Sequence, residues 1–455
     1  MRKQFAAVLC FVIFLSGCLI GPNYKKPQLD LPEGSKEDLS AFVAQDWWTM
    51  FEDSSLNALE EEALANNKDL VSAMAKVEEA RAKLGIANSA LMPTLDATGY
   101  GQRAGFAKHT GTSGFNAGLT AAYQLDFWGQ YRRLSEAARA ELLSTSAQKD
   151  TVRLALTADV ANYYFNYITL QEQVEISRRT LASRVESERI YKVRYDNGYS
   201  TELDLKRVEA ERASVEATLA EFERQLAASH NALSMLLGRS PKDIIEGSIG
   251  AEALQSVKVL PQVPQGIPAG LLERRPDVRA AEGALMAANA NVGAAKAAYF
   301  PNIVLTASGG YASGQLNTLI SPNTSFWNLG AGLYMPVFEG GKIRSKHKQA
   351  KAVYKQMLAA YEKAAQNAYR DTYDALNDNN YYRKIVEADR VQAEALARSL
   401  ELAQKQKDEG LIDMLDLLDV ERNLLNAETG LAAARRNQLS ALVSLAQALG
   451  GGWHE

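Results

Sequence analysis

Residues 64–101, LANNKDLVSAMAKVEEARAKLGIANSALMPTLDATGYG, return in altered form about 210 positions later as residues 272–309, LERRPDVRAAEGALMAANANVGAAKAAYFPNIVLTASG. The two stretches align without a gap, and each passes through a proline from a helical pattern into an alternating one. A repeat of this length indicates a duplicated supersecondary block and a chain with two related halves. The identical aligned pairs include Leu64/Leu272, Asp69/Asp277, Gly85/Gly293, Pro93/Pro301 and Thr98/Thr306.

Each half also contains one very long stretch that favours a helix. Neither Gln130–Asn197 nor Lys342–Glu409 contains a glycine or a proline, and each is 68 residues long. Their alanine, glutamate, arginine and lysine residues are good helix formers. At about 1.5 Å per residue, each helix would be roughly 100 Å long. A rod of that length must pack laterally against others, as in a coiled coil.

Two shorter helical segments in each half together match the length of one long helix. They hold 39 and 28 residues in both halves. Stacked end to end, they would form a second rod, so that the chain supplies four rods. Gly198 and Gly410 mark the hairpin turns between rods, because glycine suits the left-handed position after a helix. The segments are Tyr199–Leu237 with Leu64–Leu91, and Leu411–Leu449 with Leu272–Tyr299.

After each repeat's proline, the pattern has the period of two that is typical of strands. Phe115–Phe127 and Trp327–Met335 alternate apolar with small or polar residues, and their hairpin partners are Leu95–Arg103 and Ile303–Tyr311. Strands of about 9–11 residues with one apolar face suit an outer-membrane barrel, although a soluble sheet shows the same alternation. Four strands alone leave open edges, which a bilayer does not tolerate. We therefore expect an oligomer, with 8, 12 or 16 strands in a dimer, trimer or tetramer.

The N-terminus has the pattern of a secretory signal peptide. Arg2 and Lys3 precede the apolar run Phe5–Leu15, which is too short to span a bilayer. Leu15-Ser16-Gly17-Cys18 resembles a bacterial lipobox, in which Cys18 becomes the mature N-terminus and carries an N-acyl chain and an S-diacylglycerol. Residue 19 is leucine rather than aspartate, which directs such lipoproteins to the outer membrane. An ordinary signal peptide with an incidental cysteine is the alternative.

Composition excludes several classes of function. The formal net charge of −4 gives no basic face for nucleic acid. The four histidines, His109, His230, His347 and His454, are far apart, without metal-ligand spacing or a nucleophile motif. We therefore expect no enzyme, no metal site and no cofactor other than the lipid on Cys18.

The predicted organisation is one continuous architecture built from the two repeats. The lipidated N-terminal tether and the connection between the repeats contribute an equatorial belt around the rods. The boundaries are 1–17 for the signal peptide, 18–60 for the tether and the start of the belt, 61–238 for the first repeat with strands at about 95–127, 239–268 for the connection, 269–452 for the second repeat with strands at about 303–337, and 453–455 for the tail.

Over nearly its whole mature length, the chain resembles the TolC-like outer membrane efflux factors, particularly their NodT-type lipoprotein subgroup. The residues that carry the resemblance are Cys18, Trp47-Trp48, Leu125-Asp126-Phe127-Trp128-Gly129, Arg274-Arg275-Pro276-Asp277, Phe300-Pro301, Pro336-Val337-Phe338-Glu339-Gly340-Gly341 and Leu418-Asp419-Val420-Glu421-Arg422. The resemblance implies a mainly α homotrimer, with a 12-stranded barrel in the outer membrane above a periplasmic tunnel of helices. It also implies a lipid-anchored duct that passively exports drugs, toxic organic molecules or metal ions. An inner-membrane pump of the RND type would supply it through a periplasmic adaptor protein.

The resemblance places a gate at the periplasmic helix tip. Asp416 and Asp419 match positions that constrict the tunnel entrance, Asp204 occupies the corresponding place in the first repeat, and Arg422 is a salt-bridge partner for Asp419. Three-fold symmetry would turn each carboxylate into a ring that favours cations. The alternative is a solvated helix face with ordinary charge pairs. Some family members carry arginine where this chain has Ile412, so the details of the latch do not transfer.

Two other functions compete with the efflux duct. A type I secretion system uses a similar duct for proteins, and long helices also suit a non-conducting periplasmic spacer. Ion conductance separates a channel from a spacer, which conducts under no condition. The sequence does not identify the transported substrate.

Overall fold

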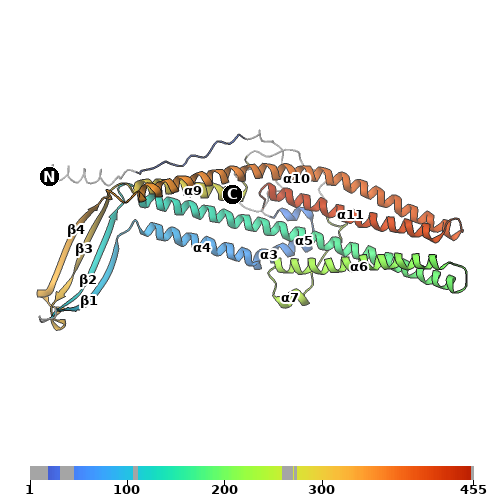
Figure 1. Cartoon of the computed structure of the whole chain (residues 1–455), viewed down its shortest axis with the longest axis horizontal. Coiled ribbons are helices and arrows are strands. Elements are labelled where there is room, and N and C mark those ends of the chain that lie inside the picture. The colour runs from blue at the N-terminus through green and yellow to red at the C-terminus, as the bar shows by residue number, and fades with distance from the viewer. Residues whose placement is uncertain (1–18, 31–45, 106–110, 259–269, 271–273, 452–455) are drawn as a thin grey trace. The chain divides into compact units, whose positions relative to one another are not determined.

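The computed structural model describes residues 19–30, 46–105, 111–258, 270 and 274–451. These residues form long helices and a four-stranded antiparallel sheet (Figure 1). The predicted class, mainly helical with four strands, is therefore confirmed. In chain order the elements are η1 Trp47–Phe51, α3 Ser54–Asn66, α4 Lys68–Ser89, β1 Thr94–Ala104, β2 Thr112–Leu125, α5 Gln130–Asp196, α6 Glu202–Leu236, α7 Pro241–Glu246, α9 Pro276–Ala297, β3 Asn302–Ser313, η2 Leu316–Thr318, η3 Pro322–Thr324, β4 Ser325–Tyr334, α10 Lys342–Asp408 and α11 Met414–Ala448.

The chain divides into two compact units, each of which draws on both repeats. The first comprises the described parts of Met1–Asp30, Ala75–Ala147 and Arg279–Ala364. The second comprises the described parts of Leu31–Met74, Gln148–Val278 and Ala365–Glu455. The first unit therefore contains the sheet, and the second contains both helical hairpin turns.

In the first unit, the four strands are ordered β1-β2-β3-β4, with every neighbouring pair antiparallel. Within each repeat the strands form a hairpin, and β2 pairs with β3 across the repeats, with Leu125 opposite Ile303 and Phe115 opposite Ser313. Among the described residues, β1 and β4 each have one strand neighbour. Both therefore present an edge of unpaired backbone groups.

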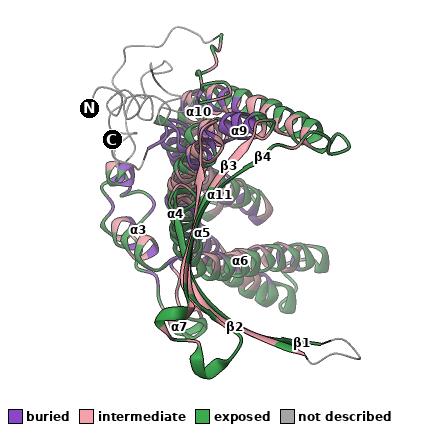
Figure 2. Ribbon diagram, turned by 90° about the vertical axis from the view of Figure 1, so that its left-hand side faces the viewer, coloured by how far each residue is buried: buried purple, intermediate pink, exposed green. Residues whose placement is uncertain are grey.

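Large apolar side chains remain exposed on the sheet. Every residue of β1 is exposed, and β4 is exposed along nearly its whole length (Figure 2). Trp327, Leu329 and Leu333 alternate along β4 and retain 79%, 73% and 69% exposure. An apolar face of this extent in a water-soluble monomer indicates an interaction site or a membrane. Within the described part of the chain, no helix is both long enough and apolar enough to cross a membrane.

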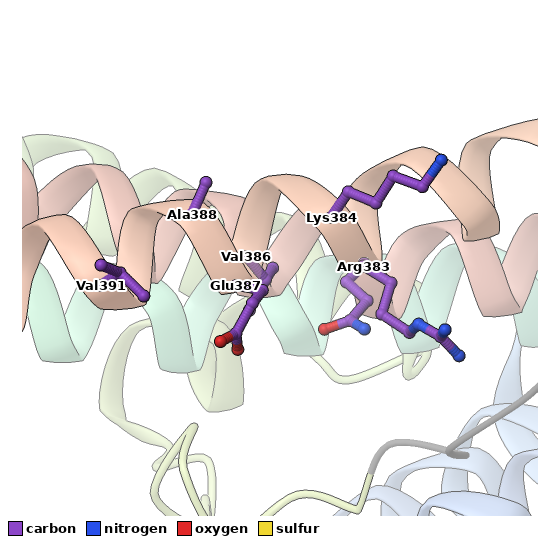
Figure 3. Close-up of a pocket in the computed structure, with 7 residues that line it drawn as sticks. Arg383, Lys384, Val386, Glu387, Ala388 and Val391 are labelled. Carbon is purple, nitrogen blue, oxygen red and sulfur yellow. The ribbon is translucent and has the colours of Figure 1, made fainter.

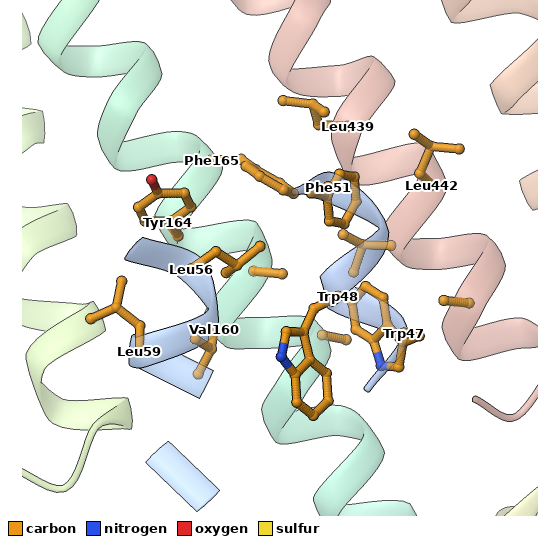
Figure 4. Packing of buried hydrophobic residues seen from close by; sticks show 14 of the residues in the cluster. Trp47, Trp48, Phe51, Leu56, Leu59, Val160, Tyr164, Phe165, Leu439 and Leu442 are labelled. Carbon is orange, nitrogen blue, oxygen red and sulfur yellow. The ribbon is translucent and has the colours of Figure 1, made fainter. Parts of the chain in front are cut away.

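In the second unit, the main core joins the short N-terminal helices to the long ones. Trp47 and Phe51 are 1% exposed and pack against α5 and α11 (Figure 4). The ring of Phe51 meets that of Phe165 edge to face, with centroids 4.8 Å apart. The burial of these aromatic rings fixes η1 against the long helices.

The helix predicted for Leu64–Leu91 is interrupted near its beginning. Helix α3 ends at Asn66, and α4 begins at Lys68. Asn67 separates them because its side-chain oxygen accepts hydrogen bonds from the amides of Asp69 and Leu70 at 2.9 and 3.0 Å. Its side-chain amide also donates to the Leu236 carbonyl at 2.8 Å. One asparagine therefore caps a helix and ties it to the end of α6.

Candidate functional site

The two hairpin turns of the second unit have the same backbone geometry. Gly198 has φ +77° and Gly410 has φ +75°. After α5, the amide of Tyr199 donates to the carbonyl of Arg194 at 2.8 Å, and after α10 the amide of Leu411 donates to that of Gln406 at 2.7 Å. Both bonds close the last helical turn around a left-handed glycine. Each glycine lies at a hairpin turn, where the sequence places it.

Asp204 has a structural task at the first hairpin. Thr201 and Asp204 form a capping box at the start of α6: the Thr201 hydroxyl accepts from the Asp204 amide at 3.2 Å. The same hydroxyl donates to the Asp204 carboxylate at 2.6 Å. The hydrogen bonds that the hydroxyl and the backbone amide of Thr201 donate to this carboxylate lower the pKa of Asp204. The carboxylate therefore remains ionised and stabilises the helix N-terminus.

Asp416 occupies the equivalent position in the second hairpin. Asp413 is the N-cap of α11 and accepts from the amides of Leu415 and Asp416 at 2.7 and 3.0 Å. The Asp416 carboxylate accepts in return from the Asp413 amide, at a longer 3.4 Å. Asp413, Asp416 and Asp419 are all exposed. Sequence reasoning missed Asp413, although an aspartate three residues before Asp416 is a capping signal.

Arg422 brings together residues of two helices. Its guanidinium donates to the Asp419 carboxylate at 2.7 Å and to Glu211 of α6 at 2.9 Å. The first contact is the pairing expected from their spacing on α11. The second, which sequence reasoning missed, links α11 to the other hairpin. Asp416 and Asp204 take part instead in their separate caps.

Behind the exposed aspartates Asp413, Asp416 and Asp419, the α5–α6 and α10–α11 hairpins share a small apolar core. Tyr191, Val208 and Leu417 are buried in it, at 7%, 0% and 1% exposure. They come from α5, α6 and α11, and α10 contributes Ala403. The position of the acidic residues is thus coupled to the packing between the hairpins.

A further residue missed by sequence reasoning, Arg184 of α5, ties the hairpins together from the inside. Its side chain has no exposed surface; Nη2 donates to the Leu418 carbonyl at 2.8 Å. Nη1 lies 3.1 Å from a Glu421 carboxylate oxygen, an ion pair rather than an aligned hydrogen bond. Burial lowers the pKa of Arg184, and Glu421 opposes that effect. Nothing in a long polar helix pattern distinguishes this arginine from its exposed neighbours.

Cys18, the predicted lipidation site, lies outside the described residues. The described chain begins at Leu19, whose neighbour Ile20 donates its amide to the Trp128 carbonyl at 3.2 Å. Trp128 lies shortly after the end of β2 at Leu125, so the first described residues lie beside the base of the strands in the first unit.

Elsewhere in the second unit, a groove of about 830 Å³ lies along α10 (Figure 3). Its charged side chains come from one helix surface, and none of its residues is a cysteine, serine or histidine that would act as a nucleophile or base. Among the described residues, no three histidine, cysteine or carboxylate side chains gather closely enough to hold a metal ion. The lining residues are Arg383, Lys384, Val386, Glu387, Ala388, Val391 and Gln438.

Comparison with known proteins assigns the family. The family described as "Outer membrane efflux protein" matches residues 59–239 and 267–451, which together include most of the chain. This chain belongs to that family. The two matched regions correspond to the two repeats. Because its family is one of outer-membrane efflux channels and not of enzymes, the efflux protein is a channel component of the outer membrane.

Relatives of this efflux protein match it over almost their whole length. The cation efflux system protein CusC of Escherichia coli O6:H1 is 33% identical, with 98% of each chain covered. The solvent efflux pump outer membrane protein SrpC of Pseudomonas putida is 34% identical, with 97% of each covered.

Solved structures agree with this assignment. The Campylobacter jejuni CmeC outer membrane channel matches with a TM-score of 0.91 at 26% identity, covering 96% of this chain and 95% of that one. The open state of the Neisseria gonorrhoeae MtrE outer membrane channel matches with a TM-score of 0.86 at 32% identity, covering 96% and 98%. The resemblance inferred from sequence is therefore confirmed for both family and fold.

Proposed function

We propose that three copies of this efflux protein assemble into one duct, with a 12-stranded barrel in the outer membrane and a helical tunnel in the periplasm. The exposed apolar sheet with an open edge at β1 and another at β4 carries this proposal. In a bilayer, unpaired edges are too costly to persist, so β4 of one copy pairs with β1 of the next until the barrel closes. Four strands per chain give 12 in a trimer, which lies within the range of outer-membrane barrels.

The duct forms the exit of a tripartite efflux system and exports small toxic molecules. The names of the relatives assign cations to CusC and solvents to SrpC, and this chain is similar to both. A periplasmic adaptor and an inner-membrane pump of the RND type supply the substrate and the energy. The Cys18 lipid anchors the chain in the outer membrane, leaving a large part in the periplasm.

The gate lies at the hairpin turns, Gly198 and Gly410. Asp416 and Asp419 face the entrance, where three copies of each form carboxylate rings that favour cations. Asp204 acts on the gate through the cap of α6, and Arg422 holds α11 against α6 through Glu211. The tunnel opens when partners at the tip separate the two hairpins, which requires these contacts to rearrange.

Planar-bilayer recordings test the gate, and asparagine is the informative replacement. Asp416→Asn keeps an oxygen that accepts from the Asp413 amide, and Asp419→Asn keeps an acceptor for Arg422 but removes the charge from their ion pair. We expect the double variant to conduct severalfold more than the wild type and to select less for cations. Glu223→Gln, an exposed carboxylate of α6, is the matched control and should behave as wild type. Unchanged conductance in the double variant would remove both aspartates from the gate, and absence of conductance in both the wild type and the double variant, with and without the adaptor protein, would exclude a channel.

A further inference from the structure

The first described residues of the chain are held by a built site in the first unit. Arg133 of α5 donates from Nε to the Ile20 carbonyl at 3.3 Å, and from Nη2 to the Gly21 carbonyl at 3.3 Å. Nη2 also donates to the side-chain oxygen of Asn23 at 2.8 Å. Asn289 of α9 donates to the Pro22 carbonyl at 3.0 Å. Every residue from Ile20 to Asn23 therefore contributes an acceptor to this site.

Arg133 is an unusual residue to find in that place. It is 1% exposed, and its remaining charge partner is Glu136, 2.7 Å away on the same helix. A buried guanidinium is costly unless its donors are satisfied. Three of its hydrogen bonds end on the N-terminal segment. The N-terminal segment thus supplies hydrogen-bond acceptors to a buried guanidinium. A tether that is not docked would leave these donors without their partners.

Glycines allow the close approach that this arrangement needs. Gly21 has φ +109°, and a Cβ there would lie 2.4 Å from the Cα of Gly293. A Cβ on Gly293 would meet the Arg133 side chain at 2.9 Å. A Cβ on Gly129, which follows Trp128, would lie 2.6 Å from the Leu19 side chain. We call Arg133, Asn289, Gly293 and Gly129 the N-terminal cradle.

The cradle lies beside an aromatic cluster at the base of the strands. Trp128 stacks on Phe300 with centroids 4.7 Å apart and meets Phe127 edge to face at 5.0 Å. The Trp128 ring nitrogen donates to the Pro301 carbonyl at 2.9 Å. These residues directly follow β2 and precede β3. Aromatic side chains in such positions prefer the boundary between lipid and water.

We propose that the N-terminal cradle is a docking site for residues 19–23, and that docking sets the depth of the strands in the membrane. Docking holds Leu19, the residue that follows the proposed lipidation site in the sequence, beside the Trp128 cluster. A free chain of the 28 residues between 18 and Trp47 would let its end wander over about 30 Å. Arg133 is a positioning residue that converts this tether into a second, fixed membrane contact. The membrane role rests on the proposed lipidation of Cys18, whereas the docking itself does not.

Hydrogen exchange measured by mass spectrometry on the purified full-length protein tests docking. Arg133→Met removes the donors that hold the segment, and we expect the Ile20 amide, which donates to the Trp128 carbonyl at 3.2 Å in the docked segment, to exchange at least tenfold faster. Arg139→Met makes the same change at an exposed position of the same helix, and it should leave the exchange unchanged. Fast exchange of the Ile20 amide in the wild type, or equal exchange of it in wild type and Arg133→Met, would overturn the docking site.

A second variant tests the docking even if Arg133→Met disturbs the folding of the first unit. Gly21→Val alters only the docked segment, and its side chain is incompatible both with φ +109° and with the contact to Gly293. It should release the segment as Arg133→Met does, while the exchange of α5 and α9 stays at the wild-type level. Gln28→Val, at an exposed position beyond the cradle, is its control. Continued protection of the Ile20 amide in Gly21→Val would contradict the proposal.

A nitroxide label on Leu333→Cys in β4 measures the depth of the strands by power saturation in lipid vesicles. When the segment is released, we expect the label to move towards the membrane surface, because the lipid no longer holds the strand base at the interface. Release without a change of depth would overturn the membrane role. Intact mass identifies the acyl chains on Cys18 separately: their absence from the wild type would refute lipidation and the membrane role, and exchange alone would then decide the docking.

Discussion

Arg184 places a positive charge where its side chain has no exposed surface, and Glu421 is its charge partner. Removing one member of a buried pair leaves the other unpaired, which costs about 3–5 kcal/mol. We therefore expect Glu421→Ala to lower the free energy of unfolding in detergent by about that amount. The double variant Arg184→Met/Glu421→Leu should recover most of the loss, because it removes both charges.

Arg178 and Glu223 provide the matched control for this pair. They join α5 to α6 at 2.7 Å, but both side chains are about half exposed. Exposed pairs contribute about 0–1 kcal/mol, so Glu223→Ala should have a small effect in the same denaturation experiment. Equal losses from Glu421→Ala and Glu223→Ala would show that burial of Arg184 does not matter for stability.

The buried carboxyl group of Glu60 in α3 makes the free energy of unfolding depend on pH. It has no exposed surface, and in the described part of the chain neither carboxylate oxygen has a hydrogen-bond partner. Burial raises the pKa of Glu60 well above its ordinary value of 4.5. The folded chain therefore keeps a proton that the unfolded chain loses, and stability falls as pH rises above about 4.5.

Glu60→Gln removes this dependence, because glutamine carries no charge at any pH. We expect the variant to unfold at a higher temperature than the wild type at pH 8, and at a similar temperature at pH 4. Calorimetry across this range is the measurement. Glu61→Gln, its exposed neighbour, should track the wild type throughout. A Glu60→Gln curve parallel to that of the wild type would mean that Glu60 is ionised in the folded chain.

The hairpin turn at Gly410 requires a glycine, whereas the position of Gly430 in helix α11 does not. Gly410 has φ +75°, where a Cβ costs roughly 1–2 kcal/mol. Gly430 lies inside α11 and is exposed, with open space around the position of a Cβ. We expect Gly410→Ala to destabilise the protein by about 1 kcal/mol and Gly430→Ala to stabilise it by about 0.5–1 kcal/mol. Urea unfolding of the two variants compares them directly, and the same sign for both would contradict this account.

Sequence patterns predicted these elements better than they predicted the contacts between them. Long runs without glycine or proline gave the 67-residue helices α5 and α10 to within a residue at each end, because helix propensity is a local property. The break at Asn67 was not predicted, although asparagine is a favoured N-cap, and the bond that ties its side-chain amide to α6 ends on a carbonyl distant in sequence. Arg133 and Arg184 escaped notice for a related reason. Both donate to backbone carbonyls distant in sequence. Every residue has a backbone carbonyl, so the sequence does not indicate which one accepts.

For the whole molecule, barrel closure predicts contacts between copies. If β1 of one copy pairs with β4 of the next, a cysteine replacing Tyr100 in β1 should form disulfides with a cysteine at some position scanned along β4. Non-reducing gels of the oxidised outer-membrane fraction would then show linked dimers and trimers. Ala117→Cys with Tyr311→Cys, which face each other across β2 and β3, should link within one chain and serves as the control. A full scan of β4 without linked chains would exclude the proposed closure.

The pairing of β2 with β3 has a consequence for how the protein is made. It joins residues about 180 to 200 positions apart, with all of α5, α6 and the connection between the repeats in the intervening chain. Contacts at such separation form slowly, because the entropy of closing the loop is lost before the pairing compensates for it. The helices are local and fold first. During biogenesis, the two strand hairpins, β1–β2 and β3–β4, therefore cross the periplasm as separate apolar segments. They need protection from aggregation until the second repeat has emerged and the sheet is complete.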